Sequence, residues 1–142
     1  MKSTLVPGLE HEFRFCVTDA QTVPALFPEA DEFQVMPTVF ATGFMVGLFE
    51  WTCIQALKPH LDWPDEQTVG THVDVSHVAA TPNGFAVTVN VKLVEVDRRR
   101  LVFEIEAHDD VDLISRGRHE RFVINKAAFD LKLKEKKTQA GN

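Results

Sequence analysis

The chain has 142 residues, of which 44% are hydrophobic and 25% are charged, as is usual for one globular domain with a single core. Its 21 acidic and 15 basic residues give a formal net charge of -6, which removes the electrostatic attraction behind most non-specific nucleic-acid binding. We therefore expect a single domain over residues 1–142 and no DNA or RNA partner.

The N-terminus and the cysteines bear on where the protein resides. The opening residues, MKSTLVPGLEHEFRF, contain no apolar segment and no small-residue cleavage site, so the sequence predicts no secretion. Cys16 and Cys53 are too few for a disulfide framework and do not form a C-x-x-C pair. We expect both to be reduced core thiols and the protein to be cytoplasmic.

The first elements are a strand and an irregular segment. Residues Glu10–Thr18 predict a strand with Phe13 and Phe15 on one face. Prolines then interrupt regular structure at three places, Pro24, Pro28 and Pro37. We expect an irregular stretch here.

The next element is an apolar helix with one charge. Residues Val39–Ile54 have the sequence VFATGFMVGLFEWTCI, in which Glu50 is the only charged side chain. A membrane-spanning helix needs about 20 apolar residues, and this segment is shorter. A short helix that is apolar nearly all round is typical of a buried core helix instead. We expect no membrane partner and a helix around which the rest of the chain wraps.

Four later segments alternate apolar and polar residues and therefore predict strands: Thr68–Ala80, Phe85–Val96, Leu101–His108 and Asp112–Ile124. Short polar connections between them favour antiparallel hairpins. One long apolar helix against a curved antiparallel sheet is an α+β arrangement and corresponds to the hot-dog fold. The tail, residues 126–142, begins as a short helix predicted over Asn125–Lys137 and frays into Lys-rich chain.

Glu50 is the first candidate for chemistry, because it interrupts the apolar helix. A carboxylate buried without a partner costs several kcal/mol or has a raised pKa, so such a group is retained where a partner or a reaction needs it. The alternative is structural: Glu50 faces solvent through a gap in the sheet or bonds to a second subunit.

His77 is the second candidate. Alternation from Val69 to Ala79 places it on the apolar face of its predicted strand, which looks toward the helix. His77 and Glu50 could then meet between helix and sheet, although one β-bulge would turn the ring outward. A lone inward histidine is more often a satisfied core residue, and only pairing with Glu50 favours catalysis.

Thr42 stands where the chain enters the helix. Threonine is favoured as an N-cap residue, which would be a purely structural role. A helix N-terminus also presents free N–H donors and a partial positive charge, which suit stabilisation of an oxyanion. Thr42 can serve both roles.

Three blocks of sequence resemble the fluoroacetyl-CoA thioesterases: FATGFMVGLFEWTCIQALKPHL, VGTHVDVSHVAATPNG and SRGRHERFVIN. The resemblance spans nearly the whole chain. It implies a homodimeric hot-dog enzyme that hydrolyses a short acyl-CoA. Because one curved sheet around one helix leaves an edge strand and an incompletely enclosed site, we expect the sites at the subunit interface. We expect no cofactor. By analogy Thr42, Glu50 and His77 are catalytic: Thr42 hydrogen-bonds within the site, Glu50 is nucleophile or general base, and His77 moves protons.

The resemblance also suggests residues that bind substrate. Gly70 matches an active-site glycine whose missing side chain lets the backbone approach the acyl group, although strand curvature would explain it equally. Arg121 lies in a matching HER motif and could orient Glu50 or close the site. The segment of residues 20–38 resembles a lid, in which Phe33 matches but Met36 stands where a second Phe is expected. Because Met is flexible, we expect weaker fluorine selectivity.

The phosphates of CoA call for basic side chains, and the candidates are Arg98, Arg99, Arg100, Arg116, Arg118 and Lys126. Most of these are expected to be solvated surface residues. Some histidines and aspartates could in principle bind a metal ion, but they lack the helix-type spacing of metal ligands: His72, His77, His108, Asp109 and Asp110. We predict no metal site.

Two other functions suit the same fold. A non-catalytic acyl-CoA-binding protein would not need a buried ionisable pair, whereas an enoyl-CoA hydratase could use Glu50 and His77 on a different substrate pose. Release of free thiol separates hydrolysis from both.

Overall fold

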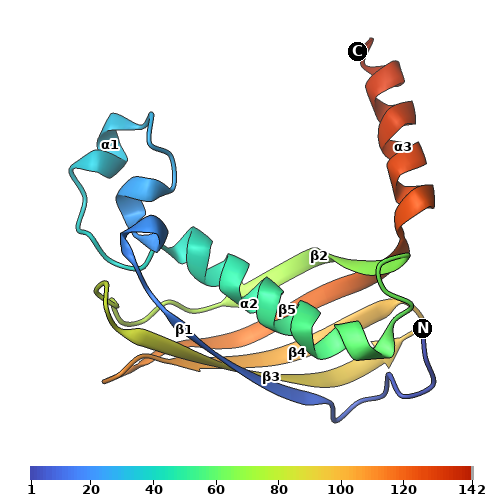
Figure 1. The fold of residues 1–142 in the computed structure, drawn as a ribbon, viewed down its shortest axis with the longest axis horizontal. Coiled ribbons are helices and arrows are strands. Elements are labelled where there is room, and N and C mark those ends of the chain that lie inside the picture. Colours follow the sequence, from blue (N-terminus) through green and yellow to red (C-terminus); the bar gives the residue numbers. More distant parts are fainter. Residues whose placement is uncertain (142) are drawn as a thin grey trace.

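The computed structural model describes residues 1–141 and consists of one five-stranded antiparallel sheet with a long helix across one face (Figure 1). The strands, in the spatial order β1-β3-β4-β5-β2, are β1 (Glu10–Cys16), β3 (Ala86–Asp97), β4 (Arg100–His108), β5 (Leu113–Asn125) and β2 (Glu66–Val75). β1 and β2 are therefore the edge strands. The predicted hot-dog fold is confirmed.

Helix α2 (Thr42–Leu57) lies on the inner face of the sheet, as the apolar stretch predicted. Met45, Phe49 and Cys53 are almost completely buried. They belong to the same core cluster as the inward residues of β3 and β4, which include Val89 and Phe103. The alternation in β3 and β4 therefore predicted the buried face correctly. Within residues 1–141, no helix is long and apolar enough to cross a membrane.

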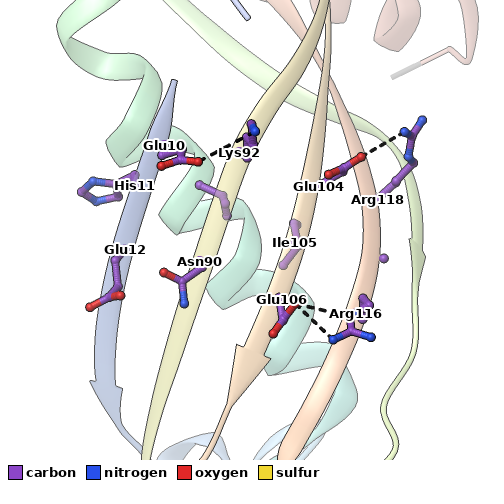
Figure 2. Close-up of a pocket in the computed structure, with 12 residues that line it drawn as sticks. Glu10, His11, Glu12, Asn90, Lys92, Glu104, Ile105, Glu106, Arg116 and Arg118 are labelled. Carbon is purple, nitrogen blue, oxygen red and sulfur yellow. Dashed lines mark hydrogen bonds and ion pairs between the residues drawn. The ribbon is translucent and has the colours of Figure 1, made fainter. Parts of the chain in front are cut away.

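The outer face of the sheet, opposite α2, carries cross-strand ion pairs (Figure 2). Arg116 lies 3.2 Å from Glu106, and Arg118 lies 3.2 Å from Glu104. These side chains line an open groove across β1, β3, β4 and β5. Because α2 covers the other face, this groove is separate from the residues that the sequence placed in the site.

Strand β2 is shorter than predicted, and His77 lies beyond its end. The register between β2 and β5 shifts at Gly70/His72. Before this bulge Thr68 and Gly70 face inward, which the predicted alternation did not expect. After it Val75 and Ala79 pack against the core and His77 faces α2, as predicted.

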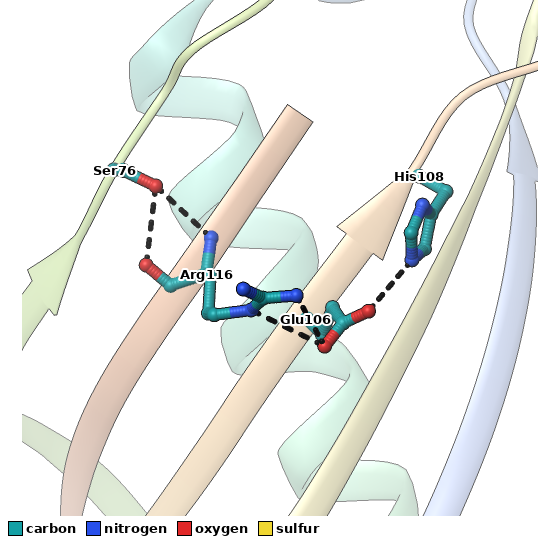
Figure 3. A network of polar contacts seen from close by, with 4 residues as sticks. All are labelled: Ser76, Glu106, His108 and Arg116. Atoms are coloured by element: carbon teal, nitrogen blue, oxygen red, sulfur yellow. Dashed lines mark hydrogen bonds and ion pairs between the residues drawn. The ribbon is translucent and has the colours of Figure 1, made fainter. Parts of the chain in front are cut away.

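After Val75 the Ser76 side chain accepts a hydrogen bond from the Arg116 backbone N–H at 3.0 Å and donates to its carbonyl at 3.2 Å (Figure 3). The Ser76 N–H also donates to the Arg116 carbonyl at 3.1 Å and the Val78 N–H to the Ile114 carbonyl at 2.8 Å, so the chain stays hydrogen-bonded to β5 beyond the end of β2.

The segment between β1 and α2 is more regular than predicted. It forms two 3-10 turns, η1 (Asp19–Gln21) and η2 (Val23–Ala25), and a short helix α1 (Asp31–Gln34). Thr18 and Gln21 close a capping box at the first turn. The segment sits beyond the N-terminal end of α2 (Figure 1), where a Cβ built on Gly43 would lie 3.0 Å from Leu26 Cδ2.

The tail forms helix α3 (Lys126–Gln139), close to the predicted bounds. The Asn125 side chain caps it by accepting a hydrogen bond from the Ala128 N–H at 3.0 Å. α3 projects away from the sheet at the end opposite α1 (Figure 1), and none of its residues is buried.

Candidate active site

Thr42 and His77 form a pair at the N-terminal end of α2. Thr42 is the first helical residue, while Ala41 occupies the N-cap position without a side-chain bond. The capping role considered for Thr42 is therefore wrong. Its hydroxyl instead forms a 2.7 Å hydrogen bond with Nδ1 of His77. The hydroxyl thus fixes one side of the imidazole ring.

The second ring nitrogen of His77, Nε2, has no partner in the described part of the protein. The ring is half-buried, and Nε2 is buried without a hydrogen-bond partner among the described residues. Burial lowers the pKa of His77, because it disfavours the charged imidazolium. The ring is therefore neutral near pH 7, with Nε2 available to exchange a proton with a bound molecule.

Glu50 occupies the middle of α2, two turns further along. Its side chain is 40% exposed, so the expectation of a fully buried carboxylate is wrong for the single chain. Oε1 accepts a hydrogen bond from Nη1 of Arg121 at 3.1 Å. The carboxylate is thus held at one oxygen, and much of its surface remains accessible.

Arg121 is a buried arginine on β5, with 3% of the residue exposed. Its Nε donates to the Thr68 hydroxyl at 2.8 Å, and its Nη2 donates to the Thr68 carbonyl at 2.9 Å. These bonds fix the plane of the guanidinium before it reaches Glu50. The structure therefore places Arg121 where it can orient Glu50.

Gly70 lies against the same carboxylate. A Cβ built on Gly70 would lie 2.6 Å from Glu50 Oε1 and 3.4 Å from Arg121 Nη1, closer to Oε1 than real side chains permit. The missing side chain makes room for Glu50, which is a more specific reason for glycine here than strand curvature.

We expected Glu50 and His77 to pair between helix and sheet, but within one chain they do not. Glu50 bonds to Arg121, whereas His77 bonds to Thr42. Eight residues separate Thr42 from Glu50 on α2, which corresponds to about 12 Å along a helix axis at 1.5 Å per residue. The Thr42–His77 pair and the Glu50–Arg121 pair therefore lie apart along the same helix.

Phe33 and Met36 both belong to the segment ahead of α2. Phe33 stacks on Phe27 with ring centroids 6.1 Å apart, and Met36 is 45% exposed. The segment is adjacent to the Thr42 end of the helix rather than to Glu50. Both residues stay candidates for covering a small ligand at Thr42 and His77.

Most candidate phosphate ligands are already paired with carboxylates. The partners are Glu106 for Arg116, Glu104 for Arg118, Glu95 and Glu120 for Arg100, and Asp130 for Lys126. Arg98 and Arg99 occupy the exposed turn between β3 and β4 and form no ion pair within residues 1–141. No group of three potential metal ligands comes together in this part of the chain.

His119 was not among the site residues predicted from the sequence. It is 1% exposed and forms a 3.0 Å contact between its Nε2 and Nη1 of Arg121. Alternation along β5 supplied a signal, because His119 and Arg121 lie two residues apart and so share the inward face with Val123.

Comparison with known proteins identifies the family. The sequence profile described as FlK, fluoroacetyl-CoA-specific thioesterase, matches residues 17–127. The fluoroacetyl-CoA thioesterase of Streptantibioticus cattleyicolor is 47% identical over 141 residues, which cover 99% of this chain and 100% of the relative. The chain belongs to the fluoroacetyl-CoA-specific thioesterase family.

Solved structures agree with this family. A structure of the fluoroacetyl-CoA thioesterase FlK has a TM-score of 0.91 at 46% identity and covers 94% of this chain and 98% of that one. A mutant of FlK in complex with acetyl-CoA gives a TM-score of 0.90 at 45% identity, with coverages of 93% and 98%. A Thermus thermophilus hypothetical protein of the thioesterase superfamily gives 0.85 at 26% identity, with both coverages at 98%. As a member of the FlK family the protein is a thioester hydrolase.

Proposed function

We propose that the protein hydrolyses the thioester of a small acyl-CoA to the free acid and CoA, with Thr42, Glu50 and His77 as catalytic residues. Support comes chiefly from the Thr42–His77 hydrogen bond, which leaves Nε2 of a neutral histidine without a partner at a helix N-terminus. The accessible carboxylate of Glu50, held by Arg121, supplies the second reactive group.

Thioester hydrolysis needs help mainly at the attack on the carbonyl. The leaving thiol has a pKa of about 8.5, comparable to that of cysteine, and departs without a strong acid. Glu50 either attacks the carbonyl to give a mixed anhydride, which water then opens, or removes a proton from the attacking water. The free N–H groups at the start of α2 suit the oxyanion, and His77 accepts and returns protons.

The acyl group that we propose is small. Phe33 and Met36 belong to the segment beside the Thr42 end of α2, where they could cover an acetyl-sized group. The relatives that share this architecture are named for fluoroacetyl-CoA. We propose that this protein accepts several small acyl-CoAs, because methionine at residue 36 makes a more deformable cover than a second aromatic ring would.

We further propose a homodimer in which each site combines Thr42 and His77 of one protomer with Glu50 of the other. β2 is an edge strand, and its Val73 side chain is 43% exposed. An unpaired edge can pair with a second copy by two-fold symmetry. Gly70 and Glu50 lie at this edge. Such symmetry would run the two α2 helices in opposite directions and bring the Thr42–His77 pair of one protomer toward Glu50 of the other.

Subunit mixing tests this arrangement. Glu50→Gln and His77→Ala chains, each inactive alone, are unfolded together and refolded at equal amounts. In a shared site, each mixed dimer has one intact site, so random pairing restores roughly a quarter of wild-type activity. If both groups act within one protomer, no activity returns. Mass in solution at several dilutions checks the dimer itself, and an active monomer of 16.0 kDa would refute it.

Activity is tested with a panel of short acyl-CoAs and a thiol-reactive dye. Hydrolysis releases free CoA thiol, whereas hydration of an enoyl-CoA or simple binding leaves the thioester intact. Thiol release that depends on the enzyme and is lost in Glu50→Gln supports the proposal. Binding of acyl-CoA with no thiol release from any member of the panel would contradict it.

We also propose a cytoplasmic location. Both cysteines are free thiols, as expected in a reducing compartment. Cys53 is buried as predicted, but Cys16 is exposed on β1, so the prediction that it is a core thiol is wrong. The test is fractionation of cells that produce the protein, with the protein expected among the contents released by lysis.

A further inference from the structure

His119 is a buried histidine that the mechanism above does not use. It lies on β5 two residues before Arg121, and the alternation of the strand turns both side chains toward α2. Only 1% of the residue is exposed. A polar ring at this depth requires partners, because a buried nitrogen without a hydrogen-bond partner is destabilising.

Both ring nitrogens of His119 have partners, and these partners permit only one protonation state. Nδ1 lies 2.8 Å from the carbonyl oxygen of His72, which can only accept, so Nδ1 carries a hydrogen. Nε2 lies 3.0 Å from Nη1 of Arg121, which can only donate, so Nε2 carries a lone pair. The ring must therefore be neutral. Burial lowers the pKa of His119, and the charge of Arg121 acts in the same direction.

Arg121 uses the two hydrogens of Nη1 on two different partners. One points to His119 Nε2 at 3.0 Å and the other to Glu50 Oε1 at 3.1 Å. Thr68 accepts from Nε and Nη2 and so holds the opposite edge of the guanidinium. His119 is thus the only protein acceptor, besides Glu50 itself, on the Nη1 edge within residues 1–141.

The bulge in β2 connects these contacts to the active site. The shift between Gly70 and His72 puts Gly70 against Glu50 and turns the His72 carbonyl toward His119. A backbone carbonyl, an imidazole, a guanidinium and a carboxylate therefore follow one another in a chain of hydrogen bonds.

We infer that His119 is a positioning residue for the proposed reaction: its Nε2 lone pair holds the Nη1 edge of Arg121 and aims the second Nη1 hydrogen at Glu50. The inference rests on the proposed role of Glu50. Without the Nε2 acceptor, one Nη1 hydrogen is left buried and unsatisfied, and Nη1 turns toward another acceptor. Glu50 then loses its fixed orientation, and kcat falls while KM changes little.

Two amide substitutions separate the two nitrogens of the ring. In His119→Gln the amide oxygen reaches the position of Nε2 and accepts from Arg121. In His119→Asn the shorter amide reaches only the position of Nδ1 and still donates to the His72 carbonyl. We expect kcat to fall roughly tenfold in His119→Asn and by no more than about threefold in His119→Gln. Equal losses in both variants would overturn the inference, because a packing role does not distinguish them.

A double-mutant comparison tests whether His119 acts through Glu50. In the Glu50→Gln background, His119→Asn should cause no further loss of the residual rate. An equal fractional loss in both backgrounds would overturn the inference while leaving the role of Glu50 intact. If Glu50→Gln hydrolyses at a wild-type rate, the proposed function fails and the inference fails with it.

The wild-type enzyme gives a test that does not depend on folding of variants. Nitrogen-15 NMR of the histidine rings should show His119 as a neutral ring with hydrogen on Nδ1 and none on Nε2 at neutral pH. The opposite tautomer, or a charged ring, would overturn the inference.

Discussion

The Thr42–His77 pair and the Glu50–Arg121 pair on α2 differ in how firmly the structure holds them. At the N-terminal end, His77 lies just after β2, and one hydrogen bond to Thr42 fixes its ring. In the middle of the helix, Glu50 is held by an arginine whose own donors are fixed by Thr68 and His119. Within residues 1–141, the first pair keeps a nitrogen without a partner, whereas the second is held by hydrogen bonds from two strands, β2 and β5.

This difference fits the different demands of the proposed reaction. A proton shuttle needs a free ring nitrogen that can change partners, and His77 Nε2 provides it. A nucleophile or base must be held at a defined angle, since small misplacements lower the rate strongly. We therefore expect substitutions near Glu50 to act through geometry and those near His77 through the lost group itself.

Removal of either reactive group should have the largest effect. Glu50→Gln and His77→Ala should each lower kcat by at least ~100-fold, the usual scale for a lost nucleophile or acid/base group. The fold should survive, which circular dichroism and thermal unfolding check. A Glu50→Gln enzyme with a near wild-type kcat would show that Glu50 is a structural residue, and the proposed difference between the two regions in catalysis would not hold.

Two glycines on paired strands should separate activity from folding. Gly70→Ala places a Cβ against Glu50 Oε1, a movable side-chain atom, so we expect kcat to fall roughly tenfold with little change in Tm. Gly117→Ala places its Cβ on the backbone carbonyl of Asp74, which cannot yield, so Tm should fall markedly. The same loss of Tm in both variants would show that Gly70 serves the strand and not Glu50.

Thr42 should matter through its hydroxyl alone. Thr42→Ala removes the hydrogen bond to His77 and should lower kcat, whereas Thr42→Ser keeps it and should be mild. Because Ala41 is the N-cap, Thr42→Ala should not carry the stability loss of a removed cap, about 1 kcal/mol. Denaturant unfolding of the wild type and both variants gives their free energies of unfolding. A loss of about 1 kcal/mol in Thr42→Ala alone would show that Thr42 does cap the helix.

Met36→Phe should change selectivity at the Thr42 end without affecting Glu50. A stiffer aromatic cover should narrow the range of acyl groups and raise the preference for fluoroacetyl-CoA over acetyl-CoA. Apolar contacts discriminate groups of this size by only about 1–3 kcal/mol, so the change is modest. The comparison is the ratio of kcat/KM values in both proteins. A native ratio that is already high and is unchanged in Met36→Phe would exclude a lid role.

The smallest expected effect is on how the free energy of unfolding depends on pH. Burial lowers the pKa of both His77 and His119, so the unfolded chain binds protons first as pH falls below about 6.5. The free energy of unfolding should therefore be lower at about pH 5.5 than at about pH 7.5. His119→Gln removes one of these groups and should show a smaller difference. The same pH dependence in both proteins would contradict a neutral, buried His119.

The sequence alone determined the elements and the family. Apolar continuity predicted the central helix, and strict alternation predicted the buried faces of β3 and β4, because both patterns depend on near neighbours in the chain. The same local patterns singled out Thr42, Glu50 and His77 as unusual residues. Gly70 and Arg121 were named only through the resemblance to known thioesterases.

Only the tertiary structure decided which of these residues meet. Thr42 contacts His77 across 35 positions of sequence, and Arg121 contacts Glu50 across 71. A single bulge at Gly70/His72 turns Gly70 against Glu50, while His77, further along the chain, lies beside the start of the helix. Such pairings depend on strand register and helix placement, which no local periodicity encodes, and for that reason His119 became visible as a partner of Arg121 only in the folded chain.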